Sequence, residues 1–65
     1  MTLREDIIMD LRTGPKAETW LVRRHIREGG PDVRKVLGRM LLDGEIVTDR
    51  TILELGRFVP VYRLP

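Results

Sequence analysis

Glycine and proline interrupt this chain at three points, and these breaks limit the length of every helix it can form. The first two are Thr13-Gly14-Pro15 and Gly29-Gly30-Pro31, and the third is Asp43-Gly44. Glycine favours the left-handed turn that ends a helix, and proline cannot continue a helix because it lacks a backbone N–H. The sequence therefore predicts three short helices before Gly44, over residues 3–12, 17–27 and 32–42.

Apolar residues recur at helical spacing in the first and third segments. Thr2 and Glu5 match a capping box at the start of the first helix. The apolar stripe of this helix consists of Leu3, Ile7, Ile8 and Leu11, and that of the third consists of Val33, Val36, Leu37, Met40 and Leu41. The second segment has a broader apolar arc. We expect Trp20 in the core or in an interface, and His25 at the surface or half-buried without a partner.

After Gly44 the pattern changes from helix to strand. Residues 45–48 and 58–64 are rich in β-branched and aromatic side chains, which predicts a two-stranded hairpin with its turn between Arg50 and Arg57. Pro60 cannot donate to a ladder and suggests an edge strand or a bulge. The predicted fold class is α+β and mainly α, with three helices and a C-terminal hairpin in a single domain over residues 1–65.

Several residue types are missing, and their absence narrows the function. The chain has 65 residues, one histidine and no cysteine, serine, asparagine or glutamine. Nucleophilic triads and four-ligand zinc sites therefore cannot be built, and so short a chain rarely forms a deep pocket. We expect no enzymatic activity, no cofactor, no metal site and no small-molecule substrate. Asp6 and Asp10 are too few ligands for a metal ion and are expected on a solvated face.

Apolar runs in this chain are short, and none exceeds three residues. A membrane span needs about 20 residues and a secretory signal about 7 to 15. We therefore expect no membrane partner and a cytoplasmic location, which would be nucleoid-associated if the protein binds DNA. The lack of cysteine agrees with this expectation.

Positive charge is concentrated in the middle of the chain. Residues 16–39 carry seven Lys and Arg against three acidic residues, a net charge of +4 within a total of +2. The segments before and after each carry −1. A basic stripe of this kind fits either a phosphate-binding surface or a solvated helix face.

The order of helix, helix, glycine-containing turn, amphipathic helix and hairpin resembles the winged helix-turn-helix family, from Leu3 to Leu64. Residues 32–46 (DVRKVLGRMLLDGEI) look like the recognition helix and wing entry of bacterial and phage regulators, and residues 61–64 are similar to the closing wing strand. The resemblance implies a small transcriptional regulator that binds double-stranded DNA. Helix 32–42 would enter the major groove, and the wing, residues 45–64, would lie on the backbone or minor groove.

The resemblance also implies roles for particular residues. On the outer face of helix 32–42, Arg34, Lys35 and Arg39 would meet DNA, and Gly38 would let the backbone approach closely. On the wing and the second helix, phosphate contacts would come from Arg50, Arg57, Arg23, Arg24 and Arg27. Each of these cations is also explained as a solvated surface charge. Without Asn or Gln, base reading is limited, so one copy is expected to discriminate weakly and to need a homodimer or a partner.

Two other interpretations remain open. A winged helix also serves as a protein-interaction module, an adaptor or inhibitor that would use Trp20, Leu42, Phe58 or Pro60 as an apolar contact. Residues 59–62 (VPVY) are similar to the wing of the domains that bind Z-form nucleic acid. However, Arg34 and Gly38 stand where that family has Asn and Tyr, and Tyr62 stands in place of its Trp. Steep salt dependence would distinguish phosphate binding from an apolar interface.

Overall fold

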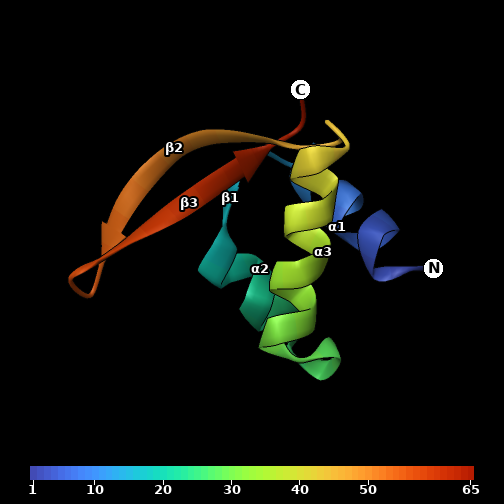
Figure 1. Ribbon diagram of the computed structural model, residues 1–65, viewed down its shortest axis with the longest axis horizontal. Helices are drawn as coiled ribbons and strands as arrows, with labels where there is room; N and C mark the ends of the chain where they lie inside the picture. Colours follow the sequence, from blue (N-terminus) through green and yellow to red (C-terminus); the bar gives the residue numbers. More distant parts are fainter.

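The computed structural model describes residues 1–65 and shows three helices followed by an antiparallel hairpin (Figure 1). The elements are α1 (Leu3–Arg12), β1 (Lys16–Ala17), α2 (Glu18–Arg24), the short 3-10 helix η1 (Ile26–Glu28), α3 (Gly30–Leu42), β2 (Val47–Glu54) and β3 (Arg57–Arg63). The predicted α+β layout of a winged helix is confirmed. None of the helices is both long and apolar enough to cross a bilayer.

The first helix has the bounds that the sequence predicts, and its cap explains why. The backbone N–H of Glu5 donates to Oγ1 of Thr2 at 3.2 Å, and the backbone N–H of Thr2 donates to Oε1 of Glu5 at 3.0 Å. These two bonds satisfy two amides that a helix start leaves without partners. The Glu5 carboxylate accepts from both the backbone N–H and the hydroxyl of Thr2, and these hydrogen bonds lower its pKa because they favour its charged form.

The connection between the second and third helices differs from the prediction. The predicted helix 17–27 is wrong in its last part, because α2 ends at Arg24 and a single 3-10 turn, Ile26–Glu28, follows. Gly29 then adopts a φ of 88°, which side chains disfavour, and its carbonyl accepts from Val33 at 3.0 Å. As a result α3 begins at Gly30, two residues earlier than predicted. Pro31 lies in its first turn, where a missing N–H costs nothing.

The core is a cluster of eight buried side chains drawn from the three α-helices, the segment before β2 and β3. It consists of Ile7, Leu11, Leu21, Val33, Leu37, Met40, Ile46 and Tyr62. The apolar stripe predicted for α3 is confirmed, with Val33, Leu37 and Met40 buried and with Val36 and Leu41 partly buried beside them. Tyr62 is the one residue of the sheet strands in this cluster, and Val59 and Val61 of the same strand are buried outside it.

The predicted strand 45–48 is wrong in its bounds, because β2 begins at Val47 and continues to Glu54. The resulting longer hairpin belongs to a three-stranded sheet of order β1-β3-β2. β1 was not predicted; it pairs Lys16 with Tyr62 and Ala17 with Val61. Two residues are too few to show an alternating pattern. The turn between β2 and β3 consists of Leu55 and Gly56, with φ of 48° and 77°. Two successive positive φ values are typical of the tight turn that suits the twist of a hairpin.

Pro60 lies on the central strand of the sheet, so the prediction of an edge strand at this position is wrong. The proline is tolerated because β1 pairs only with Val61 and Tyr62, one residue further along β3. The sheet does contain a bulge, but it interrupts β2 between Thr48 and Arg50. Asp49 is the additional residue at this point.

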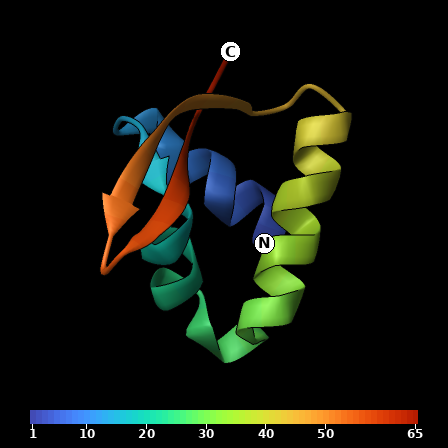
Figure 2. The ribbon, with the colours of Figure 1, turned by 60° about the vertical axis from the view of Figure 1, so that its left-hand side comes forward.

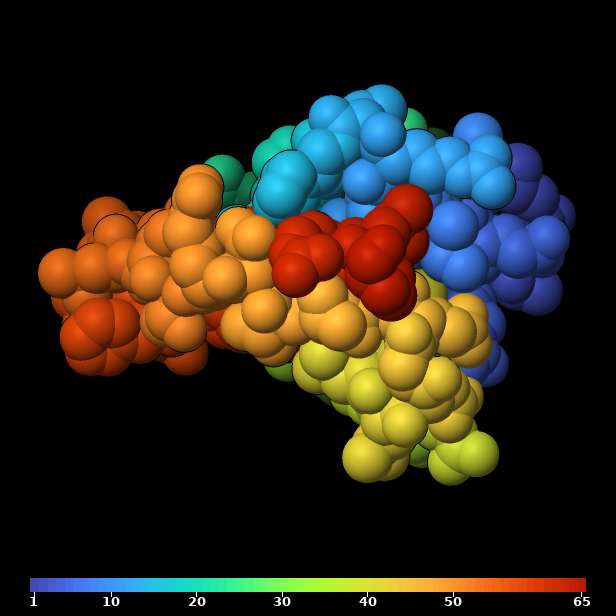
Figure 3. All heavy atoms as spheres, turned by 90° about the horizontal axis from the view of Figure 1, so that it is seen from above, coloured from blue at the N-terminus to red at the C-terminus, as the bar shows by residue number.

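The hairpin projects beyond the helical part of the molecule. Figures 1 and 2 show α2 beneath the sheet and α3 on the other side of α2, and the view from above in Figure 3 shows the tip extending away from the helices. The tip of the hairpin and α3 therefore lie on opposite sides of α2, and the three elements border a groove.

Removing a core side chain from α3 should cost much more stability than removing an exposed one. Leu37 is buried and Leu42 is 83% exposed on the same helix. We expect Leu37→Ala to lower the free energy of unfolding by about 2–5 kcal/mol, because it leaves a cavity. Leu42→Ala should change it by less than about 0.5 kcal/mol. Urea denaturation followed by circular dichroism measures both, and equal losses would contradict this description of the core.

Candidate nucleic-acid interface

The outer face of α3 presents the residues that the sequence predicts for DNA contact. Arg34, Lys35, Gly38 and Arg39 are all exposed. Five positions separate Arg34 from Arg39, which places them roughly 140° apart around the helix. Lys35 and Gly38 therefore lie near the centre of the exposed face, and the two arginines lie on its opposite flanks.

Each flanking arginine has a carboxylate partner. Nε of Arg34 lies 3.3 Å from Oε1 of Glu18 on α2, and Nε of Arg39 lies 3.7 Å from Oδ2 of Asp43 at the end of its own helix. Both guanidinium side chains are more than half exposed. Exposed ion pairs of this kind contribute little stability, so either arginine can exchange its carboxylate for a phosphate at small cost.

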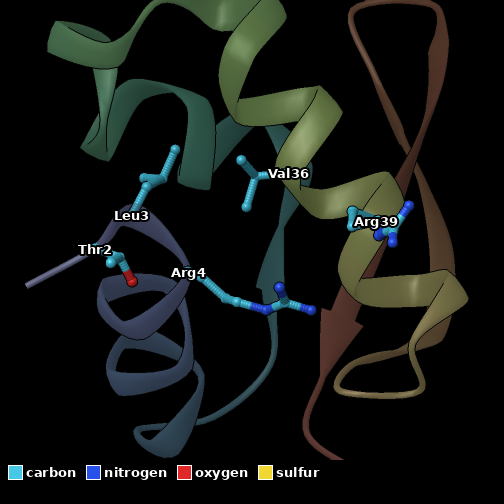
Figure 4. A pocket seen from close by; sticks show the side chains of 5 residues that line it. All are labelled: Thr2, Leu3, Arg4, Val36 and Arg39. Atoms are coloured by element: carbon cyan, nitrogen blue, oxygen red, sulfur yellow. The ribbon is translucent and has the colours of Figure 1, made fainter.

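A shallow hollow lies on the Arg39 side of α3, between α3 and α1 (Figure 4). Its volume is about 350 Å³, and Thr2, Leu3, Arg4, Val36 and Arg39 line it. Figure 4 shows Arg4 extending from α1 toward the C-terminal end of α3. There its guanidinium binds Glu45 and Asp43, and these hydrogen bonds, the one to Glu45 foremost, raise its pKa. Arg4 thus ties α1 to the start of the wing and is not a free cation.

A larger groove lies on the Arg34 side, between α2, the start of α3 and the tip of the hairpin. We call it the wing groove; its volume is about 650 Å³. Arginines from three elements line it, namely Arg23 of α2, Arg34 of α3 and Arg57 of β3. Its other lining residues are Glu18, Thr19, Trp20, Val22, Glu54, Leu55, Phe58, Val59 and Pro60. The groove therefore combines three arginines and two glutamates, a small positive excess, with exposed aromatic surface.

The eight cations implied as DNA contacts divide into free and paired groups. No carboxylate lies within 4 Å of Arg23, Arg27, Lys35 or Arg57. In the paired group, Arg24 lies 3.5 Å from Asp10 and Arg50 lies 3.8 Å from Asp49. Arg34 and Arg39, whose partners are described above, complete this group. Two of the free arginines, Arg23 and Arg57, line the wing groove. The structure thus brings Arg23, Arg34 and Arg57 together and places Arg39 on the far flank of α3.

Glu18 and Thr19, which the sequence analysis did not single out, line the wing groove and form hydrogen bonds to other elements. The Tyr62 hydroxyl donates to Oε2 of Glu18 at 3.2 Å, and the other oxygen of Glu18 accepts from Arg34. The hydroxyl of Thr19 donates to Oε1 of Glu54 on the hairpin at 2.7 Å. The one residue type in the sequence that could have indicated these contacts is the tyrosine, because a buried tyrosine hydroxyl usually finds a hydrogen-bond partner.

His25 is half-buried, as one of the two expected positions had it, but the expectation that it lacks a partner is wrong. Its Nε2 lies 2.6 Å from Oδ2 of Asp10, and the two side chains are only 12% and 10% exposed. The contact joins the last turn of α1 to the residue that follows α2. Asp10 is therefore not on a solvated face, and no three His, Cys, Asp or Glu side chains cluster in a way that could hold a metal ion.

Trp20 is not a core residue. It is 41% exposed, lies on the wall of the wing groove, and has Nζ of Lys16 at 5.2 Å from its ring centroid. The part of the expectation that placed it in the core is wrong, because the broad apolar arc of α2 buries Leu21 instead. An exposed tryptophan beside a lysine is a surface on which another aromatic group or a cation stacks.

Replacing Gly38 with alanine should stabilise the free protein. A Cβ added at Gly38 would meet no atom within 4 Å, and the residue lies inside α3. We therefore expect Gly38→Ala to raise the free energy of unfolding by about 0.5–1 kcal/mol, because alanine loses less backbone entropy in a helix. Chemical denaturation measures the change. A loss of stability would show that Gly38 has a structural role in the free chain.

Tyr62 should ionise late and make stability fall at high pH. Burial, assisted by the charge of Glu18, raises the pKa of Tyr62 from 10.0 to about 12. Its contribution to stability is therefore complete below pH 10.0 and is lost as the pH rises toward about 12. The chain has one tyrosine, so ultraviolet absorbance follows this ionisation directly. Ionisation near pH 10.0 with the native circular dichroism spectrum intact would contradict the burial of the hydroxyl.

Comparisons with known proteins identify no relative. Searches against protein-family models, curated proteins and solved structures returned no match to this chain. The functional inference therefore depends on the geometry of α3, the wing groove and the hairpin.

Proposed function

We propose that this protein binds double-stranded DNA, with α3 in the major groove and residues 45–64 against the backbone or minor groove. One observation carries the proposal: arginines from α2, α3 and β3 line the same concave surface, although they are far apart in the sequence. Phosphate groups attract such a surface electrostatically whatever the base sequence. The helix that enters the major groove in a winged helix is the one that follows the short turn, and α3 follows the turn at Gly29.

The exposed face of α3 suits close approach to base edges. An α-helix with its side chains is about 10–12 Å wide, and the major groove is about 12 Å wide. The open space at Gly38 leaves the helix backbone accessible at the centre of the face. Lys35 beside it has no carboxylate partner and is suited to guanine or phosphate, and Leu42 one turn further is suited to a thymine methyl group.

The proposed role is binding rather than catalysis. Occupying an operator would block or recruit RNA polymerase, which makes the chain a transcriptional regulator of bacterial or phage type, cytoplasmic and associated with the nucleoid. The exposed face of α3 carries no amide side chain for a bidentate adenine contact. Most of the affinity would come from phosphate contacts, and sequence discrimination by one copy would be modest.

A second candidate function is recognition of a protein, and the tip of the hairpin favours it. Leu53 and Phe58 are directly opposed across β2 and β3, and Leu55 follows in the turn. All three are exposed, Leu55 at 99% and Phe58 at 79%. Exposed apolar side chains in a group are typical of an interaction site. In this alternative, the chain would be an adaptor or inhibitor that docks through the hairpin tip and Trp20.

Fluorescence anisotropy of a labelled mixed-sequence duplex at several salt concentrations tests the proposal. We expect the affinity to fall steeply as salt rises, because each phosphate contact releases counterions. Arg57→Gln should reduce the slope by about one. Arg12→Gln is the matched control, because Arg12 is also exposed and without a carboxylate partner but lies outside the wing groove.

The outcome separates the two candidate functions. Equal effects of the Arg57 and Arg12 variants would show that binding follows net charge and not the wing groove. No binding at low salt would exclude the DNA proposal and leave protein recognition, which Phe58→Ala and Trp20→Ala should weaken with little dependence on salt. Gly38→Ala, which we expect to stabilise the free chain, should weaken DNA binding, because its methyl group obstructs close approach.

A further inference from the structure

The outer edge of β2 is free of any neighbouring strand. The sheet order β1-β3-β2 leaves one side of β2 unpaired from Val47 to Glu54. Figure 3 looks onto this side, and the orange atoms of β2 face the viewer. The middle of the strand, residues 48–51, is exposed. An edge strand of this length offers unpaired N–H and C=O groups to another strand.

The register of the hairpin shows which side chains along this edge share a face. Thr48 and Thr51 pair with Tyr62 and Pro60, which are two residues apart on β3, so both threonines lie on one face of the sheet. By the same argument Val47 and Ile52, which pair with Arg63 and Val59, both lie on the opposite face. The bulge at Asp49 produces this arrangement, because it shifts the alternation by one residue.

The sequence of this edge is complementary to itself. Residues 47–52 read Val-Thr-Asp-Arg-Thr-Ile. When two copies are laid antiparallel about a point between Asp49 and Arg50, Asp49 of each copy faces Arg50 of the other. Thr48 then faces Thr51, and Val47 faces Ile52. The threonine pair and the apolar pair each join residues of the same face. All three kinds of pair are of a type that stabilises neighbouring strands: opposite charges, two threonines, or two β-branched apolar residues.

The two central charges also exclude the neighbouring registers. A shift by one residue in one direction places Asp49 against Asp49, and a shift in the other direction places Arg50 against Arg50. Like charges directly opposite each other destabilise a pair of strands. Charged side chains and bulges on an edge usually prevent pairing with foreign strands. In this chain the same charges favour a single register, in which the neighbouring strand is β2 of a second copy.

We propose that two copies of this chain associate by antiparallel pairing of their β2 strands over residues 47–52. The result is a continuous sheet of six strands, three from each copy, with a two-fold axis between Asp49 and Arg50. The contact is isologous, because both copies use the same residues. It goes beyond the proposed DNA binding and does not depend on it. Six residues from each copy bury little area, so the dimer should be weak and dependent on concentration.

Sedimentation equilibrium without DNA, from about 10 µM to about 1 mM protein, measures the association. We expect the average mass of the native chain to rise toward that of a dimer. Asp49→Arg and Arg50→Asp should each remain monomeric, because each places like charges across the axis. An equimolar mixture of the two variants should dimerise again, because two adjacent arginines of one variant then meet two adjacent aspartates of the other in the proposed register.

The mixture distinguishes a lost interface from a lost fold. Only folded variants can restore the complex, and circular dichroism of each variant confirms its folded state. A native chain that stays monomeric at about 1 mM would overturn the proposal. So would variants that dimerise as strongly as the native chain, or folded variants whose mixture stays monomeric.

A second pair of variants tests the backbone contact. Because the turn has two residues, Glu54 and Arg57 form a hydrogen-bonded pair. Hydrogen-bonded and non-hydrogen-bonded pairs alternate along β2, so the backbone N–H of Thr51 points away from β3, toward the free edge. Thr51→Pro removes this donor and should abolish the dimer, and Thr51→Val keeps it and should preserve the dimer. Amide NMR shifts that change on dilution should centre on residues 47–52. Changes centred on Trp20 and Phe58 would overturn the proposal.

Discussion

The position of the wing relative to α3 depends on the burial of Tyr62. This is the one side chain of the sheet strands in the core cluster, and its hydroxyl is held by Glu18 of α2. The same Glu18 pairs with Arg34 of α3. Glu18 thus joins the sheet to α2 through Tyr62, whereas its exposed pair with Arg34 adds little stability and leaves that arginine available. Val59 and Val61 are the only other buried residues of the sheet strands, so in so small a domain few contacts would hold the wing if that of Tyr62 were lost.

The helices were predictable because several local signals coincide at their ends. For α1, the capping box, the apolar stripe and the Gly14-Pro15 break agree, and its bounds are correct. For α2, the apolar arc continues past Arg24, and nothing local announces the change to a 3-10 turn. β1 could not be predicted, because its two residues become a strand only by meeting Val61 and Tyr62 more than forty positions later. Pairing across the hairpin also extends β2 through residues 49–51, which show no strand pattern of their own.

The candidate site was predictable in its exposure and not in its contacts. Periodicity correctly placed Arg34, Lys35, Gly38 and Arg39 on the outside of α3. It does not reveal that Arg34 meets Glu18, sixteen residues away, or that His25 meets Asp10, fifteen residues away. These partners belong to other elements, so their positions depend on how the helices pack. The same limit applies to the wing groove, which exists only once the hairpin lies beside α2.

The backbone of Leu55 shows that the tip of the hairpin is not built for maximal stability. Leu55 is the only residue other than glycine with a positive φ, at 48°, and its side chain is almost fully exposed. A left-handed conformation costs a residue with a Cβ about 1–2 kcal/mol, and asparagine or glycine occupies such turns more readily. The leucine recovers none of this cost by burial within the chain. The turn thus keeps a conformational penalty that glycine or asparagine at this position would reduce. In return it exposes a large apolar side chain at the end of the hairpin.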